Sequence, residues 1–410
     1  MDQSQKRISA FAVAAIIVLF VLFVACRLAL REPSPSPQQE PPGTESAKSL
    51  PRQTSLDFAA IDNQPAEPPV GQLENSTVTN AAVLYRQAFA LYNTLSKDEK
   101  GLLVDWRTNV DASIDAELCE KMRPICDIMH RATAVTNCDW GIEPLMYDTK
   151  LPHLSPARGI SRAAIWNAAH CQGDDLPGAA DDVLSALRLG RSVSHTAVVG
   201  SLVDMAIQAV AESYVAANVG LFRGSETQRL TSILTDPAYE AEPSLAMEQE
   251  AIIHDRFVAK LASMPADEFE KSISQMLDGG DAPKMDRAVA LAKYKQVTDS
   301  EHDLAKALAS GSADEYEAWL QQRSELEQSN PLAKELLSSW DKFVDRVERA
   351  AVSRAMVVAA LEVAEAGPSA LQSHPDPSTG QPFVYTETTD GFELQSSFQT
   401  NGVPLKMQFK

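Results

Sequence analysis

The feature that most restricts this 410-residue chain is an uncharged apolar run at residues 8–26, ISAFAVAAIIVLFVLFVAC. As a helix this run would be about 28 Å long, close to the hydrocarbon thickness of a bilayer. A cleaved signal peptide has a shorter apolar region and a small-x-small exit site, and neither is clear here. We therefore predict a transmembrane anchor over residues 8–26, after an N-terminal tail over residues 1–7.

Two further questions concern the anchor. The residues 23–26 (FVAC) resemble the lipobox of bacterial lipoproteins, although Phe23 stands where Leu is usual, so acylation at Cys26 is the alternative. Lys6 and Arg7 precede the run and Arg27 and Arg31 follow it, so the basic residues are nearly balanced. The short N-terminal tail favours an N-in, C-out orientation, which places the body outside the cytoplasmic membrane. The membrane, through residues 8–26, is the expected partner.

Residues 27–78 form a proline-rich stretch that we expect to be a disordered linker. Nine of the forty residues 31–70 are proline, and bulky apolar residues are few. Such a segment cannot bury enough apolar surface to fold, and its prolines keep it extended. The linker should hold the body away from the bilayer.

The composition of the remainder favours helices. Aromatic residues make up 6% of the chain and hydrophobic residues 44%, with Ala and Leu abundant. This composition favours helices packed through small and aliphatic side chains over a β-sandwich. We expect a mainly α-helical domain over residues 79–367, arranged as a bundle or as repeated hairpins.

Helix-period segments and stop signals follow one another through this domain. Residues 81–95 place apolar side chains on one face, and Ser96 with Glu99 forms a capping box for the next helix. A helix over residues 160–171 and another from Pro177 resemble one tetratricopeptide-type hairpin. Further helices are predicted over residues 200–220, 244–263, 267–277, 286–309 and 331–366. Helices after Pro243 are more charged, which is compatible with two lobes.

Charge and motifs exclude several functions. The formal net charge is −20, and no cluster of Lys and Arg longer than two residues occurs, so nucleic acid is not an expected partner. The sequence has no G-x-S-x-G, P-loop, G-x-G-x-x-G or HExxH motif. We therefore assign no catalytic, cofactor-binding or metal-binding residue and expect no cofactor.

Four cysteines lie outside the anchor: Cys119, Cys126, Cys138 and Cys171. They could form disulfides in an oxidising compartment, with three possible connectivities, or remain unpaired as small buried side chains. If Cys119 and Cys126 share a helix, their Cα atoms are about 10.5 Å apart, too far for a bridge. A break at Pro124 would allow that pair.

Two groupings of these residues could carry chemistry. Cys119, Cys126 and His130 fall within about 40° of each other around an ideal helix, which is a possible metal stripe, but apolar neighbours favour a core face. His170 and Cys171 are adjacent, and adjacent helical side chains point about 100° apart, so they do not form a nucleophile–base pair on one helix. Residues 137–141 (NCDWG) suit a turn whose Trp140 packs back on the helices.

Residues 368–410 differ in composition and pattern from the helical domain before them. Residues 383–386, 392–398 and 405–409 alternate apolar and polar side chains and are separated by Asp-Gly and Asn-Gly pairs, which are hairpin signals. Residues 368–410 should thus be a three-stranded antiparallel meander on the preceding helix. A turn built by Asp376, Pro377, Gly380, Pro382 and Tyr385 should connect helix to sheet.

This tail resembles two known groups. DPSTGQPFVY (residues 376–385) followed by DGFEL resembles the segment that opens the C-terminal sheet of type II secretion pseudopilins. It also resembles the tail of an uncharacterised family of membrane-anchored helical bacterial proteins, which share a Cys-Asp-Trp-Gly string like residues 138–141 and an Ala-rich helix like residues 349–367. The second resemblance covers most of residues 80–398 and implies fold and location, but no activity.

The pseudopilin resemblance is confined to the tail. The anchor lacks the Gly-Phe-Thr-Leu-x-Glu processing site, and SSFQTNG (residues 396–402) replaces the acidic, glycine-rich calcium loop of pseudopilins. Calcium binding and fibre assembly are therefore not expected.

Together these features predict an envelope-anchored helical scaffold or protein-interaction module, rather than an enzyme. Its partner would be another protein or a cell-wall component bound in a groove between helices. Two alternatives remain: an enzyme of unrecognised type using Cys or His residues of the 119–171 region, and an accessory of a secretion or pilus-like machine.

Overall fold

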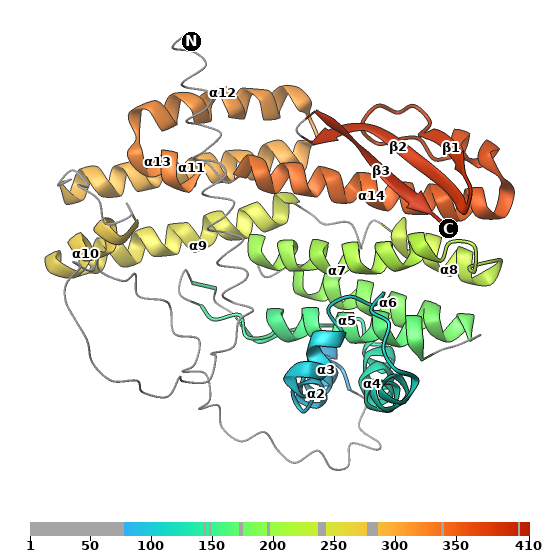
Figure 1. Ribbon diagram of the computed structural model, residues 1–410. Helices are drawn as coiled ribbons and strands as arrows, with labels where there is room; N and C mark the ends of the chain where they lie inside the picture. The colour runs from blue at the N-terminus through green and yellow to red at the C-terminus, as the bar shows by residue number, and fades with distance from the viewer. Residues whose placement is uncertain are drawn as a thin grey trace, which may run out of the picture. The chain divides into compact units, whose positions relative to one another are not determined.

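The computed structural model describes residues 78–142, 145–146, 149–171, 175–194, 197–236, 243–276, 286–337, 340–400 and 402–410. The predicted tail, transmembrane anchor and Cys26, and the linker up to residue 77, lie outside these residues, so those interpretations stay predictions. The described part is mainly helical and ends in a small three-stranded antiparallel sheet (Figure 1). The predicted fold class is confirmed at this level.

The helices follow one another along the chain in two groups. The first group is α2 (Ala81–Asn93), α3 (Lys97–Leu102), α4 (Ala112–Thr133), α5 (Leu154–His170), α6 (Leu176–Ser194), α7 (Val198–Ala217) and α8 (Ser225–Leu234). The second is α9 (Pro243–Ser263), α10 (Ala266–Met276), α11 (Arg287–Ser310), α12 (Ala313–Ser329), α13 (Pro331–Leu336) and α14 (Trp340–Ala366), which leads into a short 3₁₀ helix, η3 (Pro368–Ser373).

Side-chain caps explain where several helices begin. Asn80 accepts a hydrogen bond from the backbone N–H of Ala82 and caps α2. Ser96 and Glu99 form both halves of the predicted capping box at α3. Ser312 accepts from the backbone N–H of Glu315 and starts α12 in the same way. Each cap satisfies backbone donors that the first helical turn leaves free.

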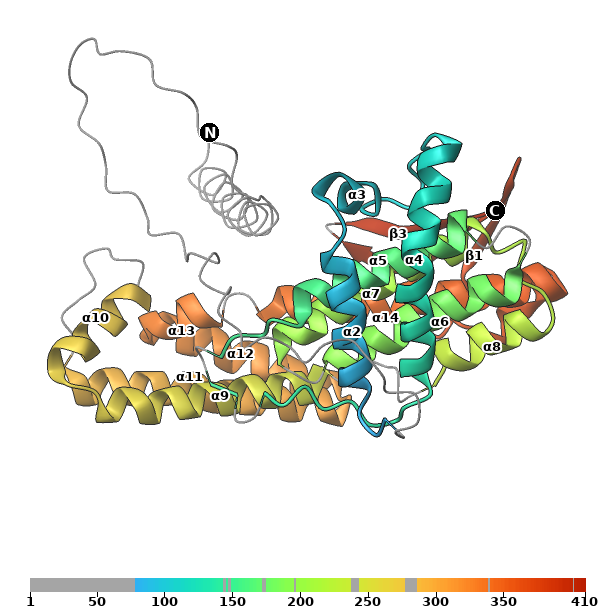
Figure 2. The same ribbon diagram turned by 90° about the horizontal axis from the view of Figure 1, so that it is seen from below.

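Two large hydrophobic cores lie side by side, and two helices belong to both. The first core joins α2, α4–α8, the C-terminal half of α14 and the sheet, whereas the second joins α9–α11, Trp319, α13 and the first residues of α14. In α7, Met205 belongs to the second core and Ile207 to the first. Helices α7 and α14 pack against each other, so they connect the two cores (Figure 2).

The helices differ from the prediction in several places. The segment 331–366, expected as one helix, is α13 and α14, because the chain turns at Leu337 and buries both Leu337 and Trp340 in the second core. Helix α5 begins at Leu154, six residues before the expected start. Helix α12 was not predicted, since Trp319 is its single buried residue among the described ones and its apolar periodicity is weak.

The sheet has the order β1 (Val384–Thr388), β2 (Gly391–Thr400), β3 (Val403–Phe409), with both pairings antiparallel. Leu394 and Phe409 on its inner face are fully buried, and the sheet packs on α14 and α7. Gly391, at the predicted Asp-Gly turn, has φ 146°, and a Cβ there would lie 2.0 Å from the carbonyl oxygen of Phe409. A residue larger than glycine would force these strands apart.

Helix α7 is long and apolar enough to cross a membrane by length and composition, with a mean hydropathy of 1.3. Most of it is buried, against α5, α6, α9, α14 and β3. Core helices of folded domains share these properties, so length and hydropathy alone do not make α7 a membrane span.

Candidate functional site

The cysteines divide into one disulfide and two thiols. Cys119 of α4 and Cys171, the C-cap of α5, form a disulfide with a Cα–Cα distance of 5.4 Å. Cys126 is buried and Cys138 half-buried, and both are unpaired thiols. Helix α4 continues through Pro124, so Cys119 and Cys126 share a helix and do not pair.

A buried carboxylate lies at the junction of α4, α5 and α6. Asp182 of α6 is 2.8 Å from Nε2 of His130 and accepts a hydrogen bond from Nδ2 of Asn167 at 2.6 Å. The hydrogen bond to Asp182 raises the pKa of His130. Burial, followed by the charge of Asp182, raises the pKa of the Cys126 thiol well above its ordinary range.

The possible metal stripe and the His–Cys pair do not form sites. Cys119 is in the disulfide, Cys126 is a protonated thiol and His130 is bonded to Asp182, so the three do not converge on an ion. His170 lies 3.0 Å from Asp115 through Nδ1 and 2.8 Å from the Trp106 carbonyl oxygen through Nε2. These contacts fix the first turn of α4 and the segment before it to the end of α5.

The predicted turn around Trp140 is present. The indole is buried, stacks on Phe89 and on His153, and donates from Nε1 to the carbonyl oxygen of Ser192 at 2.9 Å. Burial lowers the pKa of His153 to about 4, so this imidazole is neutral at physiological pH. Asn80 bonds to both backbone groups of Asp139, which joins this turn to the start of α2.

The segment of the predicted turn residues is held by the buried carboxylate of Asp376 and by backbone contacts of its neighbours. Asp376 is 1% exposed, and its carboxylate accepts hydrogen bonds from the backbone N–H and hydroxyl of Ser378, the hydroxyl of Ser396 and the backbone N–H of Ser397. Gly380 has φ 69° and donates its N–H to the Asp376 carbonyl oxygen at 2.7 Å, and Pro377 lies within the turn that this bond closes. Pro375 and Pro382 form an isolated bridge, and Tyr385 stacks on Phe392.

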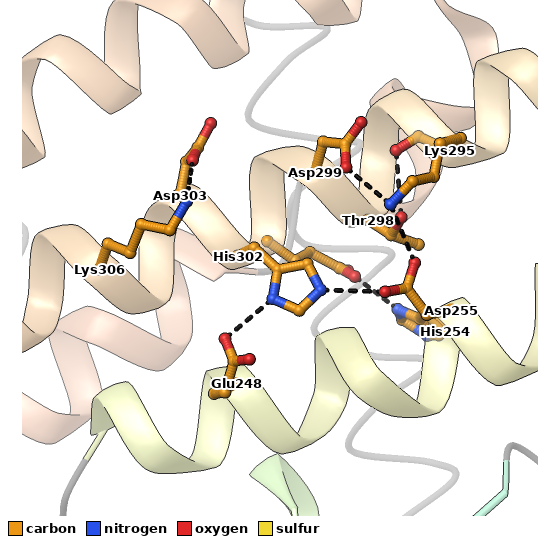
Figure 3. A network of polar contacts seen from close by, with 10 residues as sticks. Glu248, His254, Asp255, Lys295, Thr298, Asp299, His302, Asp303 and Lys306 are labelled. Carbon is orange, nitrogen blue, oxygen red and sulfur yellow. Dashed lines mark hydrogen bonds and ion pairs between the residues drawn. The ribbon is translucent and has the colours of Figure 1, made fainter.

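A second polar network, which sequence reasoning missed, joins α9 to α11 (Figure 3). His302 of α11 lies between two carboxylates of α9: its Nδ1 is 2.8 Å from Oε2 of Glu248 and its Nε2 is 3.1 Å from Oδ2 of Asp255. Lys295 of α11 reaches Asp255 at 3.2 Å and Asp299 at 2.7 Å. The network thus ties two turns of α11 to α9.

A second, buried pair joins the same two helices. Nδ1 of His254 in α9 lies 2.7 Å from Glu301 in α11, and both residues are buried. The other oxygen of Glu301 accepts a hydrogen bond from Nε1 of Trp340 at 3.3 Å, so α14 is joined to the same carboxylate. Burial lowers the pKa of His254, but the hydrogen bond and charge of Glu301 and the charge of Glu250 raise it by more.

A third polar group lies where α7 meets α14. Asp204, Gln208 and Glu212 are spaced by four residues and share one face of α7. Arg354 of α14 donates to Gln208 Oε1 at 2.8 Å, and Gln208 Nε2 donates to Asp204 Oδ1 at 2.9 Å. Burial raises the pKa of Asp204 to about 6 and that of Glu212 to about 7.

A small cavity adjoins this group and is lined by Leu187, Gln208, Ile233, Leu234 and Arg354. Its volume of about 10 Å³ has room for about one water molecule. Oδ2 of Asp204 and Oε1 of Glu212 are buried and have no hydrogen-bond donor among the described residues. The group can bind protons, but the cavity is too small for an organic substrate.

The sequence contained signals for both the α9–α11 network and the α7–α14 polar group, although neither was predicted. Asp204, Gln208 and Glu212 interrupt an apolar helix at i, i+4 and i+8, and Lys295, Asp299 and His302 share a face of α11. The spacing on one helix does not identify the partner on another, because His302 and Asp255 are 47 residues apart.

Comparisons with known proteins found no matching family model, no similar curated protein and no similar solved structure. Within the described residues, no group of three or more His, Cys, Asp or Glu side chains is placed to hold a metal ion. A function must therefore be inferred from the geometry and chemistry of the side chains.

Proposed function

We propose that this protein is a membrane-tethered, extracytoplasmic helical scaffold that binds another protein. The observation that carries the location is the Cys119–Cys171 disulfide. Structural disulfides form and persist in oxidising compartments, such as the space outside a cytoplasmic membrane. The apolar run at residues 8–26 and the proline-rich stretch after it, preceded by a short tail, supply the tether in this proposal.

The use of the polar side chains supports a scaffold. His130, His170, His254 and His302 each bond to a carboxylate or a carbonyl group of another helix or loop. These contacts fix helices relative to one another, and α7 and α14 extend through both cores. A rigid helical frame of this kind presents surfaces in fixed positions, which reduces the entropy lost when a partner binds.

The thiols offer less support for an enzyme. The disulfide occupies two cysteines, burial keeps the Cys126 thiol protonated, and burial raises the pKa of Cys138 to about 11. A reactive cysteine needs the opposite, a lowered pKa and access to solvent. A thiol enzyme would therefore need a different arrangement of this region.

Site-directed photocrosslinking in intact cells tests the proposal. A photoreactive amino acid replaces exposed residues on three faces of the full-length protein: Gln321 on α12, Glu365 on α14 and Thr386 on β1. The proposal expects a discrete protein adduct from one face and none from the other two. Adducts to cell-wall material alone would identify a different class of partner and contradict a protein-binding scaffold.

A second measurement separates scaffold from enzyme. The double variant Cys126→Ala, His130→Gln removes the thiol and the imidazole at the α4–α6 junction. A scaffold retains the crosslink, provided that the variant is folded by circular dichroism. If the double variant keeps the crosslink but no longer supports the protein's function in cells, an enzymatic role is favoured instead.

A further inference from the structure

The two carboxylates around His302 favour the protonated form of its imidazole ring. Nδ1 faces Glu248 at 2.8 Å and Nε2 faces Asp255 at 3.1 Å, so each ring nitrogen points at a carboxylate oxygen (Figure 3). A neutral imidazole carries one N–H and one lone pair. If His302 were neutral, one nitrogen lone pair would face a carboxylate oxygen. Both hydrogen bonds form when the ring is an imidazolium.

His254 has a similar position in the same interface. Its Nδ1 is 2.7 Å from Glu301 and its Nε2 is 3.9 Å from Glu250, the residue one turn earlier on α9. As an imidazolium, His254 compensates the buried charge of Glu301 and reduces the repulsion between Glu301 and Glu250. Both histidines therefore join α9 to α11 through charged contacts.

The charged groups near the interface are mostly acidic. Helix α9 contributes Glu248, Glu250 and Asp255, and α11 contributes Glu301 with Lys295, Asp299, Asp303 and Lys306. The other packed elements supply neutral contacts: Trp340 of α14 to Glu301, Trp319 of α12 to Ser300, Asn330 at the start of α13 to Lys293, and the α7 backbone at Val198 to Glu250. Lys295 bonds to Oδ1 of Asp255, the α9 carboxylate whose Oδ2 faces His302.

We propose that the contact between α9 and α11 is a pH-operated clamp, closed when His254 and His302 are imidazolium and loosened when they lose their protons. Loss of the proton on His302 breaks one of its two bonds and leaves Glu248 or Asp255 without that partner. A neutral His254 retains one N–H, which can still donate from Nδ1 to Glu301, but the ring no longer compensates the charge of that buried carboxylate. The clamp therefore loosens on alkalisation.

The direction of the effect follows from the pKa values. Burial lowers the pKa of His302, but the hydrogen bonds to Glu248 and Asp255 raise it by more, so the net value lies above the ordinary 6.5. The stabilisation is fully present below about pH 6.5 and is lost as pH rises through the folded-state pKa. The clamp therefore loosens above about pH 6.5, as pH rises through the folded-state pKa of His302.

Hydrogen exchange tests the clamp in the full-length protein. Protection factors of α9 and α11, corrected for intrinsic exchange, should fall by about tenfold for each pH unit between 6.5 and the folded-state pKa of His302. Helix α5 supplies the internal reference. Isotope-edited NMR of the histidine side chains, assigned with His302→Gln, should show His302 titrating above about pH 6.5.

Matched variants separate the clamp from a structural role. His302→Gln keeps a hydrogen-bonding side chain without a titrating charge and should reduce the pH dependence of α9 and α11 protection to the part that His254 contributes. The double variant Glu248→Gln, Asp255→Asn should return the titration of His302 towards its ordinary value. Asp303→Asn, which removes the exposed Asp303–Lys306 pair on the same helix, should leave the wild-type pH profile.

Two results would overturn the clamp. One is a His302 that titrates at or below about pH 6.5 in the wild type. The other is a His302→Gln protein, folded at pH 6, whose α9 and α11 protection falls with pH as in the wild type.

Discussion

At the scale of residues, the structure concentrates ionisable side chains at a few buried positions. Glu212 is 5% exposed and Asp204 fully buried, yet Arg354 is the guanidinium that both sense. Arg191 also acts on Asp204, but burial outweighs these positive charges and favours the protonated forms of both carboxyls. Buried carboxyls with raised pKa values lower the free energy of unfolding as pH rises. The pH dependence of stability therefore reports the protonation of these carboxyls.

Glu212→Gln should raise the stability of the protein at pH 8. The pKa of Glu212 is raised from 4.5 to about 7, so its stabilising contribution is fully present below about pH 4.5 and is lost as pH rises through about 7. The difference is at most about 3 kcal/mol, from about 1.4 kcal/mol per pH unit. Urea unfolding at pH 5 and pH 8 measures it.

Glu365→Gln, at an exposed position near the end of α14, is the control for Glu212→Gln and should leave the pH profile unchanged. If Glu212→Gln destabilises the protein equally at both pH values, Glu212 is not protonated in the folded protein at pH 5, and the predicted sign is wrong.

Asp376→Ala should weaken the junction between helix and sheet. The change removes the acceptor of four hydrogen bonds, two of them from backbone N–H groups, and leaves buried donors unsatisfied. We expect a loss of about 2–4 kcal/mol in urea unfolding at pH 7. Asp390→Asn, in the exposed turn between β1 and β2, should cost under about 0.5 kcal/mol. Equal effects of the two substitutions would contradict the role of Asp376.

The residue-scale features that sequence predicts are those with local partners. The capping box of Ser96 and Glu99 and the turn around Trp140 follow from residues close together in sequence. The bond from His254 to Glu301 joins residues 47 positions apart, and the one from Arg354 to Gln208 joins residues 146 apart. Propensity and periodicity carry no information about such pairings.

At the scale of elements, the disulfide links α4 to the end of α5. The sequence left three pairings open because connectivity depends on how helices pack, and the packing places Cys119 beside Cys171. The same limit applies to α13 and α14, where burial of Leu337 and Trp340 in one core interrupts a segment with continuous helical periodicity. Strand boundaries were close to the prediction because the Asp-Gly turn restricts them.

The double variant Cys119→Ala, Cys171→Ala should lower the free energy of unfolding by about 4 kcal/mol, because the bridge spans 52 residues of chain and restricts the unfolded state. A thiol count in the denatured wild-type protein, taken under acid quench, checks the bridge itself. Two more thiols should react after reduction than before it. An unchanged count would show that the cysteines are reduced and would remove the support for an oxidising compartment.

At the scale of the whole molecule, α7 and α14 make the two cores interdependent. Each helix contributes buried side chains to both, and the α7–α14 polar group lies near the change from one core to the other. The change in charge along the sequence is compatible with two lobes, but it could not show that shared helices connect the two cores. A substitution that destabilises one core should therefore also destabilise the other.

Leu304→Ala, at a fully buried position of the second core, should cost about 2–5 kcal/mol and lower the unfolding midpoint of both cores together. Tryptophan fluorescence reports both, since Trp166 lies in the first core and Trp340 in the second. Single-tryptophan versions of the protein, each carrying Leu304→Ala, give the two midpoints separately. Separation of the midpoints, with that of Trp166 unchanged, would show that the cores unfold independently.

The acidic residues of α7 also matter during biosynthesis. In the proposed topology the chain crosses a membrane unfolded, and every apolar segment meets the lipid before the helices can pack. Helix α7 is long and apolar enough to enter it. Asp204 and Glu212 oppose that transfer, since a charged residue near the centre of such a helix costs about 2.5–3.5 kcal/mol. In that topology, the carboxyls that weaken the folded core also disfavour the insertion of α7 into the bilayer.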